Sequence, residues 1–593
     1  MKLHNIIKAA MVGMLAFGLS SCEDFLNRPS EDSYNTANFY QNDEQCIQGV
    51  NYLYNSPWYD FLRPFLWIGE CMSGNIFQGD NKYMDFNVDN TEENLVKMSY
   101  SLWSVNGHAN TVIYNIQNSE GPSQAIKDQC IGEALTWKAM AYFFMVRTFG
   151  EVPIIHDNNE VLTSGTYNDV YKATRPAIYE YIVMTLEKAM ELLPKKGVNA
   201  NGRLDYYSAE ALLAKVYLTK AGLDGALNAE DLQKAAAYAK DVIENSGRDL
   251  MEEYSDNFRL QHNINKEALI TWQWRVSTYW TSANAFQNEL AMGGFSDFEL
   301  NGCWGDWTAP SVDLMDAFGV SPDEDPVKRS KDVYKDKRRH ATMMMPGDTY
   351  DYFWTDKGGF DYLKFIYDAE DYGKGGPSGS FNSPTGANCV KHLTGRQADH
   401  VAGVGYTAVE QQTGLATHLL RFSDVLLIYA EAMMGTNGST SDASALEAFN
   451  RVRRRAGVDE VSGVLTWEQV WKERRLEFAH EGDRWYDYVR RSYYDVQSCI
   501  AEIKAQRRGQ FYGVGVMAEA YYNSGIWPEN TVEYTEADGT PVYTTRYNTA
   551  AAVPNVTTES FTLPLPSYDV EFNPNLAAPA KDVDVRATYV YNF

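Results

Sequence analysis

The segment ERRLEFAHEGDRWYDYVR, residues 473–490, combines acidic, basic and aromatic side chains at helical spacing. Glu473 and Glu477 lie four residues apart and Arg474 precedes Glu477 by three, so a helix would place these charges on one face. Such a segment can be catalytic, or it can be a partly buried ion network that fixes helix packing. The network is favoured, because neighbouring arginines hold carboxylates ionised and unable to act as acids. Its candidate partners elsewhere in the chain are Arg421, Asp424 and Glu431.

Before this segment in the chain, small, apolar and aromatic residues recur at helical spacing in three pairs of segments. In each pair the later segment has offsets of four and three, as in tetratricopeptide repeats, whose two helices pack through small and aromatic residues. Three unrelated amphipathic hairpins are the alternative. The residues are Leu135, Ala139 and Tyr142 with Ile182, Leu186 and Ala189; Ala214 and Tyr217 with Ala235, Ala239 and Val242; and Ala430 and Met433 with Ala445, Phe449 and Val452.

The regions between these pairs differ in composition. Residues 255–420 are rich in Gly, Trp, Asp and Pro, and GKGGPSGSFNSPTG at 373–386 must be a loop. Residues 505–565 contain short β-type runs of Tyr, Val and Thr. The sequence therefore predicts a mainly α, tetratricopeptide-like helical-repeat scaffold with long irregular loops and a few short strands, the loops carrying function. The scaffold is expected at residues 36–255 and 415–505, and the loop-rich inserts at 256–414 and 506–593.

Composition narrows the class of protein. The chain has 593 residues, which is too long for one ordinary core and favours cooperating units or a large helical array. The formal net charge of -27 argues against nucleic acid and against charge-driven docking on anionic lipid, because both need clustered Lys and Arg. Aromatic residues make up 13% of the chain, and flat rings suit stacking on sugars, although a Tyr-rich core would also use them.

The N-terminus has the layout of a secretory signal. Residues 1–8 carry Lys2, His4 and Lys8 and form a basic region, and the apolar run over residues 9–19 is too short to span a membrane. The run ends in Leu19-Ser20-Ser21-Cys22, which resembles the lipobox of bacterial lipoproteins. Residues 1–21 are therefore expected to be a lipoprotein signal peptide, and residues 22–35 a tether acylated at Cys22. An ordinary signal peptide with a coincidental cysteine is the alternative.

The cysteines and the residues after Cys22 add two expectations. None of the seven cysteines is in C-x-x-C spacing, so neither a zinc site nor a redox motif is indicated. Acylation of Cys22 resolves the odd count and leaves six cysteines whose pairing the sequence does not settle. The acidic pair Glu23-Asp24 resembles signals that send some lipoproteins to the outer cell surface.

Several segments, in order along the chain, resemble the SusD/RagB family of surface nutrient-binding lipoproteins. The most specific are FNRVRRRAGV at 449–458 and ERRLEFAHEGDRWYDYVR at 473–490. Where the family often ends Asn-Pro-Gly-Tyr, this chain has Ala577-Ala578-Pro579, so the resemblance gives no expectation for the packing of the tail. The other segments are CEDFLNRP at 22–29, EALTWKAMAYFFMVRTFGEVPII at 133–155, NGRLDYYSAEALLAKVYL at 201–218, LLRFSDVLLIYAEAMM at 419–434 and LPLPSYDVEFNPNL at 563–576.

The resemblance implies a helical scaffold with a loop-rich ligand face. It implies a lipid-anchored protein at the cell surface that caps a TonB-dependent outer-membrane transporter and delivers oligosaccharide to it, or peptide in some members. No chemistry is expected of such a protein, so the chain is predicted not to be an enzyme. A surface glycoside hydrolase is the alternative from a different class, since the abundant carboxylates neither reveal nor exclude a catalytic pair.

Aromatic residues in loop-like sequence supply the candidate ligand contacts. Trp272 and Trp274 alternate as in a strand and are expected to be half-buried packing residues. The first-rank candidates sit among Gly, Ser, Asn and Asp, where rings can stack on a pyranose while polar groups bond its hydroxyls; for Trp304 and Trp307 the alternative is that the ring tucks under its own loop. These candidates are Tyr279, Trp280, Trp304, Asp306 and Trp307. Second-rank candidates, from the N-terminal quarter, are Trp58, Tyr59, Asp80 and Tyr83.

Metal and cofactor sites receive little support. The nine histidines include neither H-x-x-x-H nor H-E-x-x-H. DFNVDNTEENLV at 85–96 begins like a calcium loop, but Asn90 and Val96 stand where an EF-hand needs Gly and Glu. No cofactor, metal ligand or catalytic residue is therefore assigned, and a casual calcium ion elsewhere is left open.

Overall fold

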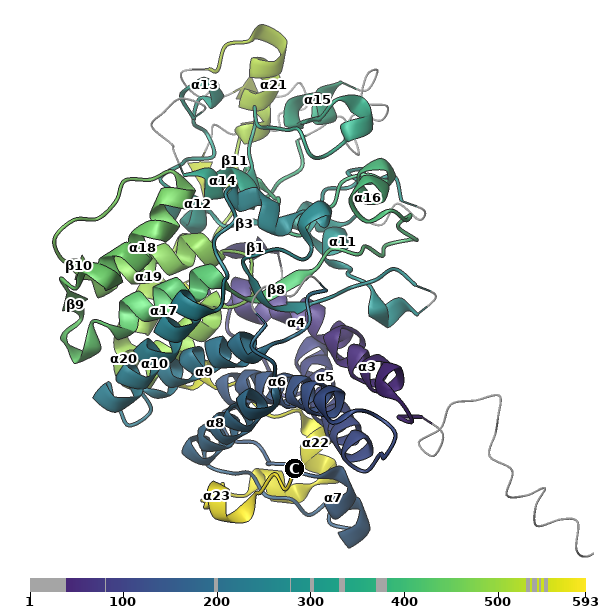
Figure 1. Ribbon diagram of the computed structural model, residues 1–593. Coiled ribbons are helices and arrows are strands. Elements are labelled where there is room, and N and C mark those ends of the chain that lie inside the picture. Colours follow the sequence, from purple (N-terminus) through teal and green to yellow (C-terminus); the bar gives the residue numbers. More distant parts are fainter. Residues whose placement is uncertain are drawn as a thin grey trace, which may run out of the picture.

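The computed structural model describes most of the chain after residue 38 (Figure 1). The predicted signal peptide, Cys22, the predicted tether and Asp80 all lie outside the described residues, so the expectations for them stay predictions. The described residues are 39–79, 81–196, 201–277, 279–298, 303–329, 336–368, 381–528, 534–535, 541–542, 546–548 and 553–593.

Long helices form the scaffold, and the three predicted pairs are present. Every residue that predicts them is buried except Met433, which is half-buried. α8 also packs on α9, and α10 packs on α17, so the pairs form one continuous array and the alternative of unrelated hairpins is wrong (Figure 1). The pairs are α6 (Gln124–Phe149) with α8 (Arg175–Leu192), α9 (Tyr206–Lys220) with α10 (Ala229–Asn245), and α17 (Phe422–Ala432) with α18 (Ala443–Ala456).

Local sequence signals set where these helices begin. At α9 the Asp205 carboxylate accepts a hydrogen bond from the Ser208 backbone N–H at 3.0 Å, and the Ser208 hydroxyl completes a capping box. Gly202, with φ +71°, turns the chain just before this cap, and an added Cβ would collide with the side chain of Gln273. The Gly-Arg turn in the segment 201–218 is therefore the entry to α9.

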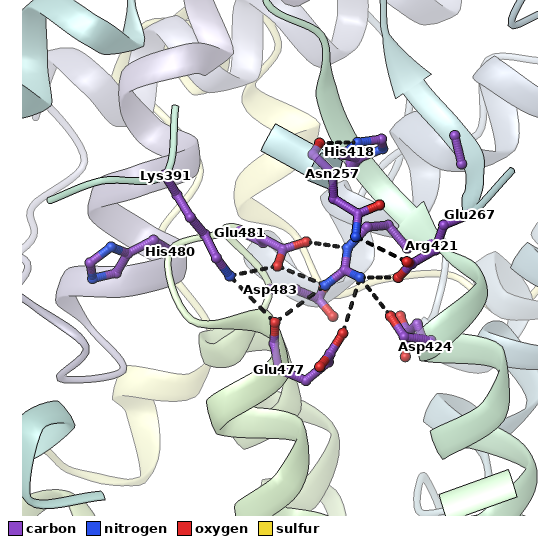
Figure 2. A network of polar contacts seen from close by, with 12 residues as sticks. Asn257, Glu267, Lys391, His418, Arg421, Asp424, Glu477, His480, Glu481 and Asp483 are labelled. Atoms are coloured by element: carbon purple, nitrogen blue, oxygen red, sulfur yellow. Dashed lines mark hydrogen bonds and ion pairs between the residues drawn. The ribbon is translucent and has the colours of Figure 1, made fainter. Parts of the chain in front are cut away.

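The charged segment 473–490 spans the end of α19 (Trp467–Phe478) and the start of α20 (Arg484–Ala505), and most of its charges are buried. Arg421, at the end of β8 (Thr417–Arg421), lies among carboxylates from distant parts of the chain (Figure 2). It donates to both oxygens of Glu481 at 2.8 and 2.9 Å, to Glu477 at 3.1 Å, and to Glu267. Burial alone would raise the pKa of Glu481, but Arg421 and Lys391 lower it to about 2.

A second cluster of buried ion pairs lies around Arg474. Its guanidinium contacts Asp424 at 2.6 Å and Asp487 at 3.0 Å, while Lys215 from α9 bonds Asp424 at 2.7 Å. Arg490 bonds Glu431 at 2.6 Å. The expectation that 473–490 is a structural ion network, with Arg421, Asp424 and Glu431 as partners, is confirmed.

The loop-rich inserts contain short helices and two-stranded ladders. Within the described residues every ladder is antiparallel and has two strands, as the predicted few short strands require. Trp272 and Trp274 are fully buried beside the ladder of β2 (Ala268–Trp272) with β8, more deeply than expected. The elements used below are β1 (Ile76–Gln78), α11 (Phe286–Leu290), β3 (Thr308–Pro310) and α22 (Ser567–Phe572).

The C-terminal tail packs against the first helix pair although it departs from the family ending. The Tyr591 hydroxyl lies 2.9 Å from the Thr185 hydroxyl of α8, and the Tyr591 ring lies against the His156 ring with centroids 4.6 Å apart. Arg586 bonds Glu187 of α8 at 2.9 Å. The tail therefore covers the outer surface of α8, where Figure 1 places the C-terminus.

Candidate functional site

The first-rank aromatic candidates lie at the surface of the loop-rich region. The exposed fractions are 76% for Tyr279, 36% for Trp280, 44% for Trp304 and 65% for Trp307. The alternative in which Trp304 or Trp307 tucks under its own loop is therefore wrong. Exposure of large rings on loops is what a sugar-stacking surface requires, while ligand contact itself stays a prediction.

Two second-rank candidates are buried, and the expectation that they contact ligand is corrected. Trp58 is fully buried against Trp137 and Trp272, and its indole N–H donates to the Leu53 carbonyl at 2.8 Å. The Asn-Ser-Pro sequence before it resembles a loop, but residues 56–61 form a 3₁₀ helix that packs on α5 (Glu93–Gln117). Tyr83 is also buried, and its hydroxyl donates to Glu92.

Trp307 lies in a turn whose backbone is held by hydrogen bonds to α11 and to the residues that follow it. The backbone N–H of Trp304 donates to the Asn288 carbonyl at 2.9 Å, and that of Gly305 donates to the Ala291 carbonyl at 2.8 Å. Gly305 lies so close to Leu290 that no Cβ fits there. Asp306 accepts from the Gly293 backbone N–H at 3.1 Å, and β3 then pairs with β1. These bonds anchor the backbone on and after α11 and leave the Trp307 ring outside.

Trp307 separates two neighbouring pockets, and Gln510 lines both. The larger pocket has a volume of about 580 Å³ and the smaller about 280 Å³. Their walls are rich in amide groups and backbone, so hydrogen-bonding groups surround an exposed ring. The larger pocket is lined by Phe77, Gln78, Gly79, Asn81, Met84, Asp85, Trp307, Arg508, Gly509, Gln510, Asn548 and Pro554. The smaller is lined by Asp306, Trp307, Phe381, Asn382, Ser383, Pro384, Gln510, Phe511, Tyr512, Gly513, Val514 and Gly515.

A second aromatic group is connected to α11 through Arg63. The 3₁₀ turn of residues 280–282 packs against the helix of residues 56–61, and Trp280 hydrogen-bonds to the half-buried Tyr59 hydroxyl. Arg63 bonds Glu289 of α11 through its Nε at 3.0 Å, one residue from the Asn288 carbonyl that holds Trp304. α11 therefore connects the Tyr59–Trp280 group to the turn that carries Trp304 and Trp307.

Arg508 forms part of the wall of the larger pocket, and no pattern in the sequence indicates this role. Its exposed fraction is 7%, and burial lowers the pKa of its guanidinium to about 10. The guanidinium donates to the carbonyls of Cys71, Met72 and Met84 at 2.5, 3.1 and 3.1 Å. It therefore ties together chain segments that lie more than 400 residues apart in sequence. No local pattern could reveal this, because every carbonyl partner is remote.

The described residues offer no evident metal centre. They contain no group of three or more His, Cys, Asp or Glu side chains placed to hold a metal ion. At the rejected calcium loop, Asp89 bonds Lys82 and the Thr91 backbone N–H, each at 2.9 Å. In the described part of the chain, no helix has the length and apolar character to cross a membrane.

Comparison with known proteins identifies the family. The SusD family model matches residues 273–578, and a second model, described as starch-binding and associating with the outer membrane, matches residues 69–218. A SusD-like protein of Bacteroides ovatus is 30% identical over 588 residues, which cover 98% of both chains. The chain belongs to the SusD family.

A further SusD-like relative and a solved structure agree with this assignment and with the fold. SusD-like protein P2 of Formosa agariphila is 27% identical over 65% of this chain and 70% of its own. A crystal structure described as being with xylogluco-oligosaccharide superposes with a TM-score of 0.73 at 28% identity, over 92% of this chain and 100% of that chain. The predicted mainly α, SusD-like fold is confirmed, and the family's second model associates it with the outer membrane.

Proposed function

We propose that this SusD-family protein is a lipid-anchored, cell-surface glycan-binding protein that captures oligosaccharide and passes it to a TonB-dependent outer-membrane transporter. The observation that carries the proposal is the exposed Trp307 ring between two amide-lined pockets. An exposed ring stacks on the apolar face of a pyranose while neighbouring amides bond its hydroxyls. The xylogluco-oligosaccharide named for a relative of 28% identity supports a glycan as the ligand.

Binding is tested with the purified protein and a panel of polysaccharides, by affinity electrophoresis followed by calorimetry. We expect at least one glycan to bind, and Trp307→Ala to lower its affinity at least about tenfold, as a central aromatic contact does. Tyr568→Ala is the matched control, because Tyr568 is a 61% exposed ring on α22, outside both pockets. If no glycan bound, or if Trp307→Ala and Tyr568→Ala behaved alike, the proposal would fail and peptide ligands would be tried next.

Hydrolysis of the glycan and association with the transporter need separate measurements. A binding protein releases no reducing sugar from the glycan that it binds, whereas a surface hydrolase does. Affinity purification of the tagged lipoprotein from detergent-solubilised outer membranes should recover a TonB-dependent barrel. Sustained release of reducing sugar would reject the non-enzymatic role, and recovery of no barrel would reject the transfer step.

A further inference from the structure

The charges at the Trp307 pockets differ from those of a site for acidic sugars. Asp85 lines the larger pocket, is exposed, and makes no ion pair among the described residues. Asp306 lines the smaller pocket, and only one bond to it is seen within the described chain, from the Gly293 backbone N–H. Each pocket therefore presents a carboxylate beside the same exposed ring.

Arg508 is the one cation among the described side chains that line these pockets, and its hydrogen-bonding capacity is already used. Four of its N–H groups donate to the carbonyls of Cys71, Met72 and Met84 and to the Gln506 side chain. The remaining N–H, on Nε, is buried. Recognition of a sugar carboxylate or sulfate by arginine uses a free, forked pair of N–H donors, and Arg508 has none to offer.

The other polar groups at Trp307 suit hydroxyls. Gln78, Asn81 and Asn548 in the larger pocket and Asn382 in the smaller carry side-chain amides, and Gln510 faces both. An amide both donates and accepts, as a sugar hydroxyl does, and an ionised carboxylate accepts from hydroxyls. An anionic substituent would instead lie near Asp85 or Asp306, and like charges brought together oppose binding.

We infer that the two pockets at Trp307 select uncharged, hydroxyl-rich oligosaccharides and reject acidic ones, with Asp85 and Asp306 as the specificity-determining residues. The inference rests on the proposed function and narrows its ligand to neutral glycans. The selection is electrostatic, so it weakens as salt screens the carboxylates.

Calorimetry of the purified protein against matched classes of probe tests this inference. The neutral probes are xylogluco-, gluco- and manno-oligosaccharides, and the acidic probes are oligogalacturonate and oligoalginate. We expect a neutral probe to bind with an affinity that salt leaves unchanged. We expect every acidic probe to bind at least about tenfold more weakly, with the difference shrinking at high salt.

Variants that replace the two carboxylates by amides of the same shape test whether the carboxylates cause the selection. The double variant Asp85→Asn, Asp306→Asn should reduce the ratio of neutral to acidic affinity at low salt, whereas Glu468→Gln, an exposed carboxylate at the start of α19, should leave it unchanged. An acidic probe that binds more tightly than every neutral one, or a ratio that the double variant leaves unchanged, would overturn the inference and leave the proposed function standing. Absence of binding by both classes would overturn the proposed function and the inference with it.

Discussion

Glu70 is a buried carboxyl group that makes no ion pair among the described residues. It lies in a π-helical turn, Trp67–Cys71, and accepts hydrogen bonds from the Gly482 backbone N–H at 2.7 Å and from the Asn75 amide at 2.9 Å. Burial raises its pKa to about 7, although these hydrogen bonds oppose the shift. This residue therefore links the N-terminal quarter to the corner between α19 and α20 through a bond that depends on pH.

Glu70→Gln should flatten the pH dependence of stability. In the wild type, the unfolded chain ionises near the ordinary glutamate value while the folded chain keeps its proton until about pH 7. The free energy of unfolding therefore falls as pH rises between these values, by up to about 3 kcal/mol for a shift of this size. Glutamine cannot ionise, so the variant should gain stability relative to wild type between acidic pH and pH 8.

Denaturant unfolding at a series of pH values measures this difference. Glu468→Gln is the control, because Glu468 is exposed at the start of α19. A difference between Glu70→Gln and wild type that stays constant with pH would show that the folded-state ionisation of Glu70 is ordinary.

The candidate site could be predicted only in part, because local sequence limits but does not decide which rings are exposed. Trp304 and Trp307 stand among Gly and Asp in loop-forming sequence, which allowed either an exposed ring or one tucked under its own loop, and both rings are exposed. Trp58 stands in equally loop-like sequence, yet tertiary packing under α5 buries it. Arg508 and Gln510 reach Trp307 only through contacts with remote segments, and their own sequence, RRGQ, carries no pattern that indicates a pocket.

At the scale of elements, the buried ion network connects neighbouring helices through contacts that are more specific than apolar packing. Arg421 from β8 binds Glu477 and Glu481, at the end of α19 and just beyond it. Arg455 of α18 binds Glu477 and, at 2.9 Å, Glu267 next to β2. Each carboxylate is therefore shared by cations from different elements, so these elements can pack in only one register.

Arg421→Met should destabilise the protein severely, because it leaves Glu267, Glu477 and Glu481 buried with fewer compensating charges. Removing one partner from a buried ion network costs about 3–5 kcal/mol. The matched control is Arg454→Met in α18, since Arg454 is exposed and pairs with Glu447 and Glu460 on the surface. An exposed pair contributes about 0–1 kcal/mol.

The free energy of unfolding of both variants, from denaturant titrations, checks this ordering. Equal losses from Arg421→Met and Arg454→Met would mean that the network contributes little beyond surface pairing. A loss confined to Arg421→Met would attribute the coupling between β8 and α19 to the buried charges.

The helical elements were predictable from the sequence because their packing is periodic. Ala235, Ala239 and Val242 repeat at the spacing of one helix face, and all three are buried in α10 against α9 and α17. The burial of the ion network also followed from local sequence, because arginines and carboxylates alternate at helical offsets in 473–490. The packing of the tail did not follow, because Tyr591 contacts Thr185 across more than 400 residues.

At the scale of the whole molecule, the proposed attachment to the membrane depends on one residue. The six cysteines within the described residues are all free and buried, so their thiols are closed to acylation in the folded protein. The net charge of -27 provides no attraction to an anionic lipid surface. If the protein is held at the membrane, as proposed, Cys22 is the cysteine available to carry the lipid.

Cys22→Ala should therefore release the protein from the membrane without changing its fold or its affinity for glycan. Multiple acyl chains on one residue give stable anchoring, and the variant loses that anchoring. Fractionation of cells and labelling with a palmitate analogue measure the effect, with Cys46→Ala as the control, because Cys46 is buried in α3 (Asp43–Asn51). The control should stay labelled and membrane-bound. A Cys22→Ala protein that still labelled and fractionated with the membrane would place the lipid elsewhere and reject Cys22 as the anchor.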